Sequence, residues 1–220
     1  MLNDKILMLR ERLIGMSALV QEMIEHSIRG LLEKDAPLLR EIIEIQEPKV
    51  NQLEVELDEV STSLIALHEP KARDLRLILM VMRINNDLER IGDHAVNIAE
   101  SGLYLIDRPP VKSLVDIPRM AELAVAMLRD ALDAFIHEDP ARAREILARD
   151  DEVDALRLQV LRELVVIMTS EAAAIERSLH LDRIAQNLER AADLSTNIAE
   201  DVIYLAEGTV VKHHAQEPEN

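Results

Sequence analysis

The stretch Arg83-Ile-Asn-Asn-Asp-Leu-Glu-Arg-Ile-Gly-Asp93 decides the fold, because it returns one hundred residues later as Arg183-Ile-Ala-Gln-Asn-Leu-Glu-Arg-Ala-Ala-Asp193. The match continues at the same offset, where Asn97-Ile-Ala-Glu100 returns as Asn197-Ile-Ala-Glu200. Apolar and polar positions are therefore copied together, with the spacing of an amphipathic helix. Self-similarity at a fixed offset indicates a duplicated structural unit. The sequence predicts two copies of one helical unit.

Helix boundaries follow from the residues on either side of this repeat. In the first unit, an apolar seam from Leu2 to Met23 predicts one helix, and the breaks near Asp35-Ala-Pro37 and His68-Glu-Pro70 separate two more. The second unit repeats this order, with helices expected over 118–137, 140–169 and 173–207. We therefore predict an all-α fold of two tandem, pseudo-symmetric three-helix bundles, 1–108 and 113–208, and a mobile polar tail, 209–220.

The composition limits the classes of function. The chain of 220 residues has a formal net charge of -17, which opposes binding to the phosphate backbone of nucleic acids. It contains no cysteine, which excludes disulfides, thiolate metal sites and cysteine nucleophiles. Neither a signal peptide nor an apolar run of about 18 residues is visible. We expect a cytoplasmic protein that does not span the membrane.

Paired carboxylates are the candidate chemistry of the repeat. Residues four apart lie on one helix face, where two like charges repel each other unless a cation lies between them. The middle helix of each unit offers a second pair, so adjacent helices could supply oxygen ligands of the kind that magnesium, manganese or iron accepts. The eight candidate metal ligands are Glu47, Asn51, Glu89, Asp93, Asp150, Asp154, Glu189 and Asp193.

Simpler interpretations compete with this one. In a chain with 42 acidic residues, most spaced carboxylates are merely solvated, although their repetition favours a specific role. We expect Arg90 and Arg190 to pair with acidic neighbours or to stabilise the repeat interface rather than to bind phosphate. Asn97 and Asn197 are candidates for hydrogen bonds across helices.

The sequence shows no catalytic constellation. None of the seven histidines stands three residues after a glutamate, and the five glycines are scattered singly, so a di-iron oxidase core and a phosphate cradle are both disfavoured. We therefore expect no enzymatic activity. Two other possibilities stay open: a carboxylate-bridged metalloenzyme that uses iron or manganese, and a helical scaffold that binds no metal.

The repeated motifs resemble the signature helix of the PhoU family. The residues that carry the resemblance are Asp74-Leu-Arg76, Asn86-Asp-Leu-Glu-Arg-Ile-Gly-Asp93 and Asn97-Ile-Ala-Glu100, and the second copy from Asn187 to Glu200 matches the second half of the family pattern. The resemblance implies two pseudo-symmetric bundles whose acidic motifs bind metal ions such as iron, manganese, magnesium or zinc. The first bundle departs from the pattern, because Asn51 replaces an expected Asp and Pro48 lies inside the motif.

The resemblance also implies a biological role. Members of this family act with a high-affinity phosphate ABC transporter and restrain both phosphate uptake and the phosphate-starvation response. The implied partners are the ATPase subunit of the transporter and a sensor histidine kinase, contacted at the inner membrane surface. A homodimer is the expected form.

Overall fold

The structure is a computed structural model that describes residues 2–208, and all of its regular elements are helical. The first unit contains α1 (Leu2–Glu33), α2 (Ala36–Glu41), the π-helical turn η1 (Ile42–Gln46), α3 (Glu47–His68) and α4 (Arg73–Ile106). The second contains α5 (Asp116–His137), α6 (Pro140–Leu147), α7 (Asp150–Ser170), the 3-10 turn η2 (Ala172–Ala174) and α8 (Ile175–Glu207). The predicted all-α class is confirmed. The tail predicted at 209–220 lies outside the described residues.

The middle helix of each unit departs from a regular α-helix, and in the second unit this corrects the prediction of one continuous helix over 140–169. In the first unit the π-helical turn η1 comes directly before Glu47, whose N–H donates to the Ile42 carbonyl. Pro48 follows in the first turn of α3, where its missing N–H breaks the series of helical hydrogen bonds. In the second unit the chain leaves the helix at Ala148 and Arg149, and α7 starts at Asp150. Both interruptions therefore lie immediately before the acidic motif.

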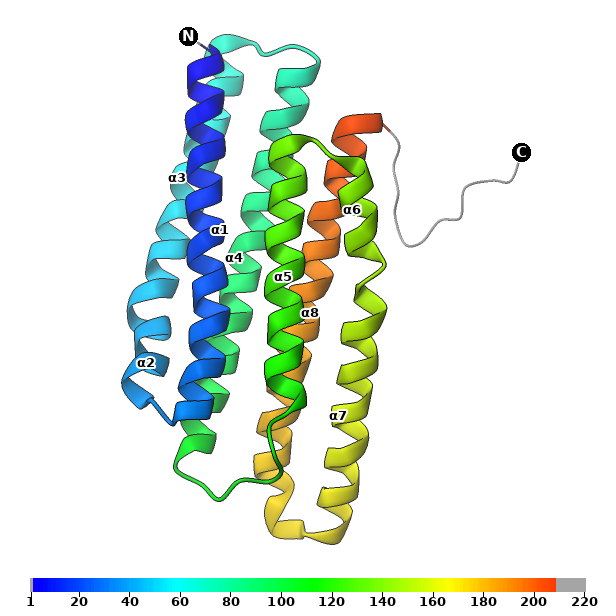
Figure 1. The fold of residues 1–220 in the computed structure, drawn as a ribbon. Helices are drawn as coiled ribbons and strands as arrows, with labels where there is room; N and C mark the ends of the chain where they lie inside the picture. The colour runs from blue at the N-terminus through cyan, green and yellow to red at the C-terminus, as the bar shows by residue number, and fades with distance from the viewer. Residues whose placement is uncertain (1, 209–220) are drawn as a thin grey trace, which may run out of the picture.

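The six long helices run along one another, with α4 and α8 antiparallel to each other between the two units (Figure 1). Helix α4 packs extensively against both α1 and α8, and α5 packs against α8 and α1. The seam predicted for the first helix is buried, with Leu9, Leu13 and Met16 fully inaccessible to solvent. Buried residues of both units form one continuous apolar cluster. The two bundles thus share a core along α4 and α8.

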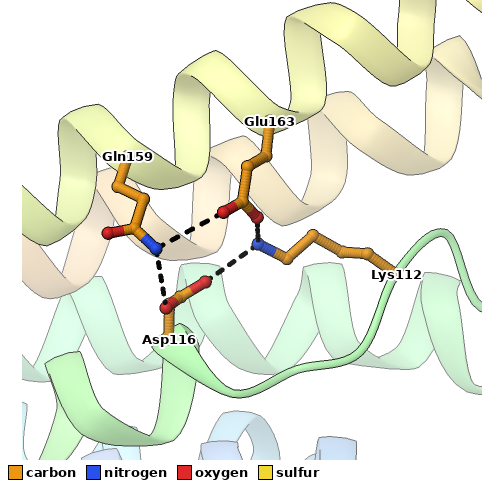
Figure 2. A network of polar contacts seen from close by, with 4 residues as sticks. All are labelled: Lys112, Asp116, Gln159 and Glu163. Carbon is orange, nitrogen blue, oxygen red and sulfur yellow. Dashed lines mark hydrogen bonds and ion pairs between the residues drawn. The ribbon is translucent and has the colours of Figure 1, made fainter.

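Polar contacts hold the linker between α4 and α5 against the second unit. Lys112 donates to Asp116 over 2.9 Å and to Glu163 of α7, while Gln159 of α7 donates to both carboxylates (Figure 2). The Lys112 side chain is only 13% exposed. Burial by itself lowers the pKa of the Lys112 ammonium, but the hydrogen bonds with Glu163 and Asp116 outweigh it and raise the pKa. The start of α5 is thereby held against α7.

Candidate metal centre

A cluster of three carboxylates lies where the first turns of α7 pass α8. Asp150 is the first residue of α7, Asp154 follows one turn later, and Asp193 faces them from α8. One carboxylate oxygen from each of the three residues lies within 4.8 Å of the other two. Asp150 is half-buried and the other two are exposed. The break at Ala148 and Arg149 is what places Asp150 at a helix start, where the helix dipole favours negative charge.

Burial and electrostatic repulsion both act on the pKa values of the acidic residues in and beside this cluster. Partial burial and the nearby Asp154 carboxylate raise the pKa of Asp193, against the opposing influence of Arg190. Burial, Asp193 and Asp154 likewise raise the pKa of Glu189, one turn before Asp193 on α8. Each shift means that the anionic form is disfavoured where it lies. A cation between α7 and α8 would relieve this repulsion.

The donor set fits a hard cation. Carboxylate oxygens are the ligands preferred by magnesium, manganese and calcium, and they also bind iron. Three side chains from two helices would hold such an ion and leave its remaining positions to water. Glu189 lies outside the group of three but remains close enough to add negative charge. Bound there, the ion would neutralise the cluster and fasten α7 to α8.

The first bundle arranges its acidic motif differently. Asn51 donates its amide to Glu47 over 2.6 Å, so the neutral residue occupies one of the carboxylate oxygens. Burial and Glu47 raise the pKa of Asp93, and burial, Asp93 and Glu54 raise that of Glu89. Within residues 2–208, however, these side chains form no group of three acidic ligands comparable to that of the second bundle. The two bundles are related by pseudo-symmetry, but their acidic motifs do not form equivalent candidate metal sites.

Polar contacts across α4 and α8 were only partly expected from the sequence. Asn97 accepts a hydrogen bond from Arg183 over 2.5 Å, which confirms the hydrogen bond across helices expected for Asn97. Arg183 also reaches Glu100, and the imidazole Nδ1 of His94 donates to Asn187 over 2.9 Å. Near the other end of the interface, Arg83 pairs with Asp201 over 3.0 Å. Arg83 and Arg183 occupy equivalent positions of the repeat. This equivalence is the feature of the sequence that could have indicated their role at the interface.

The two signature arginines differ from each other, and the expected pairing with an acidic neighbour is confirmed for Arg90. Arg90 makes an ion pair of 3.5 Å with Asp87 on its own helix. For Arg190, no carboxylate within residues 2–208 lies at ion-pair distance from the guanidinium. Burial lowers the pKa of the His94 imidazole, and the nearby guanidiniums of Arg190 and Arg90 lower it further, against the opposing hydrogen bond to Asn187. Arg90 on α4 and Arg190 on α8 thus both lie near His94 and line the same groove.

These features define a class: helical proteins of two repeated three-helix units that carry acidic motifs on adjacent helices. The PhoU domain family matches this chain twice, at residues 13–102 and 117–202. The chain therefore belongs to the PhoU family. It is 39% identical over 204 residues to the "phosphate-specific transport system accessory protein PhoU homolog" of Aquifex aeolicus, covering 93% of this chain and 92% of that protein.

Solved structures agree with the assignment. The crystal structure of PhoU from Pseudomonas aeruginosa superposes with a TM-score of 0.91 at 33% identity, covering 95% of this chain and all of the other. The phosphate transport system regulatory protein PhoU from Streptococcus pneumoniae gives a TM-score of 0.90 at 28% identity, covering 97% of this chain and all of the other. None of the helices in residues 2–208 is long and apolar enough to cross a membrane.

Proposed function

We propose that this protein is a metal-binding regulatory adaptor of a phosphate ABC transporter, which restrains phosphate uptake and phosphate-starvation signalling. Membership of the PhoU family and the names of the relatives, which are accessory proteins of phosphate-specific transport systems, support the transport role. The partners are the ATPase subunit of the transporter and a sensor histidine kinase, and the protein acts as a homodimer at the cytoplasmic surface of the inner membrane.

One observation carries the metal-dependent part of this proposal. The carboxylates of Asp150, Asp154 and Asp193 converge from two helices within 4.8 Å. Without a cation, three negative charges at this separation destabilise the contact between α7 and α8. With a cation, they favour it. Metal binding therefore sets the rigidity of the second bundle, and the adaptor function needs no catalytic step.

A complementation experiment tests this role. The gene is deleted in its host, and a phosphate-starvation reporter is measured in phosphate-replete medium after complementation with wild type, Asp150→Asn/Asp193→Asn or Asp151→Asn. The double variant removes two cluster carboxylates, whereas Asp151→Asn removes a carboxylate of the same helical turn that lies outside the cluster. We expect the deletion to derepress the reporter, and wild type and Asp151→Asn to restore repression while the double variant does not.

Two results would contradict the proposal. An unchanged reporter in the deletion strain would exclude the regulatory role. Full repression by Asp150→Asn/Asp193→Asn would instead separate regulation from the carboxylate cluster, and would leave the protein as a scaffold that needs no metal.

A further inference from the structure

The antiparallel pairing of α4 and α8 brings the two copies of the signature motif together. Arg83 of α4 pairs with Asp201 near one end of the interface, and Arg183 of α8 contacts Asn97 and Glu100 near the other. Helices α4 and α8 run antiparallel (Figure 1). Because equivalent residues are one hundred positions apart, these contacts relate the two helices by a pseudo-twofold axis that passes between the motifs. The axis places Arg90 and Arg190 in one groove.

This groove has a volume of about 650 Å³ and lies open to solvent between α4 and α8. Besides Arg90 and Arg190, its polar lining includes His94, Asn97, Asn197 and Thr196, together with the carboxylates of Asp93, Asp150, Asp193 and Glu200. The side-chain carbonyl of Asn97 already accepts a hydrogen bond from Arg183, so the side-chain NH2 group of Asn97 is left as a donor. Donors and acceptors therefore meet around one cavity.

The guanidiniums of Arg90 and Arg190 line one groove and offer hydrogen-bond donors to an anion from two helices. Arg190 has no carboxylate of residues 2–208 at ion-pair distance, and the only ion pair of Arg90 there is the long one to Asp87. The planar fork of each guanidinium matches two oxygens of a tetrahedral oxyanion. Four carboxylates line the groove together with the two arginines, so an anion binds there only where these carboxylates are neutralised or accept its proton.

The carboxylates of the same groove decide which oxyanion fits. Asp150 and Asp193 belong to the proposed metal cluster, where a cation would neutralise them. Asp93 and Glu200 remain as acceptors, and they repel a fully deprotonated anion but accept a hydrogen bond from one that still carries an O–H group. At neutral pH inorganic phosphate keeps such a proton, whereas sulfate has none.

We propose that the groove between Arg90 and Arg190 binds inorganic hydrogenphosphate, and that binding strengthens when Asp150 and Asp193 are neutralised by metal. This inference rests on the metal binding of the proposed function for its second part. The two arginines donate to the phosphate oxygens from opposite helices, and the wall carboxylates accept its proton. Phosphate thereby ties α4 to α8 across the boundary between the bundles.

Equilibrium dialysis with radiolabelled inorganic phosphate tests this proposal on the untagged full-length protein, with and without added Mn²⁺. We expect saturable binding by the metal-loaded wild type and affinity at least about tenfold weaker in Arg90→Gln and in Arg190→Gln, since each loses a charge-assisted hydrogen bond. Arg119→Gln is the matched control, because it removes an equal charge from an exposed site on α5. It should bind as the wild type does, and excess sulfate should not compete.

No saturable phosphate binding by the metal-loaded wild type would overturn the inference, as would unchanged affinity in both variants of the groove arginines. Circular dichroism checks that the variants fold, which is expected for exposed side chains. Bound manganese is measured in the same samples. Metal without phosphate would reject this inference and leave the proposed function standing, whereas loss of metal binding itself would count against the metal centre.

Discussion

Asp87 illustrates how the α4–α8 interface changes the chemistry of a single residue. Its carboxyl group is 13% exposed and lies near Arg90, Arg83 and Asp201. Burial outweighs the attraction of Arg90, and the neighbouring Asp201 adds repulsion, so the pKa rises to about 6. The folded state then holds this proton more tightly than the unfolded chain does. This group's contribution to stability is therefore largest at low pH and is lost as the pH rises from about 4 to about 6.

Replacing the Asp87 carboxyl by an amide should remove this loss of stability with rising pH. We expect the free energy of unfolding of Asp87→Asn, relative to wild type, to increase by roughly 2–3 kcal/mol between pH 4 and pH 7, following about 1.4 kcal/mol for each pKa unit. The second repeat has Asn187 at the equivalent position, so the fold accommodates the amide. Urea denaturation at several pH values measures this difference. A difference independent of pH would show that Asp87 titrates normally in the folded protein.

At this scale the sequence predicted candidates better than their arrangement. The repeat singled out Asp193 and its partners Asp150 and Asp154, and the structure brings these three together. The sequence could not show that the Asn51 amide would donate to Glu47, because pairing between side chains four residues apart depends on their rotamers. It also could not place Arg190 in a shared groove, since that depends on how α4 crosses α8.

At the scale of elements, two glycines of α1 have opposite surroundings. A Cβ at Gly30 would lie 2.7 Å from two side-chain atoms of Leu39, which is fully buried in α2. A Cβ at Gly15 would meet no atom within 4 Å. Gly30 therefore permits the close approach of α2 to α1, whereas Gly15 only weakens the helix.

Alanine substitutions should separate these roles. We expect Gly15→Ala to stabilise the protein by about 0.5–1 kcal/mol, through the gain in helix propensity alone. Gly30→Ala makes the same gain but must displace Leu39, so we expect a net loss of about 1–2 kcal/mol. Chemical denaturation of the two variants provides the comparison. Equal stabilisation by both would show that α2 moves away from α1 without cost.

Helix existence was predictable from the apolar seams, but the interruptions of the middle helices were predictable in one copy only. Pro48 signals a disturbance in the first unit, and η1 lies directly before it. Around Ala148 and Arg149 neither glycine nor proline marks the break. The Asp139 carboxylate, which accepts from the N–H groups of Ala141 and Arg142, signals only where α6 begins.

For the whole molecule, the shared core determines how it unfolds. The sequence predicts two bundles, yet the buried residues of both form one apolar cluster along α4 and α8. Separating the units would expose apolar faces of both long helices to water. We therefore expect one cooperative thermal transition, with equal calorimetric and van't Hoff enthalpies. Two resolved transitions in scanning calorimetry would mean that the bundles are independent domains.

The central claim is that the carboxylates of α7 and α8 hold a metal ion, and metal content tests it most directly. Untagged wild type and Asp150→Ala/Asp193→Ala are purified without chelators and compared by elemental analysis. We predict bound manganese, iron, magnesium or zinc in the wild type and its loss in the variant, in which two of the three cluster carboxylates are gone. Equal metal content in the two proteins, or none in either, would contradict the claim and reduce the cluster to a solvated acidic surface.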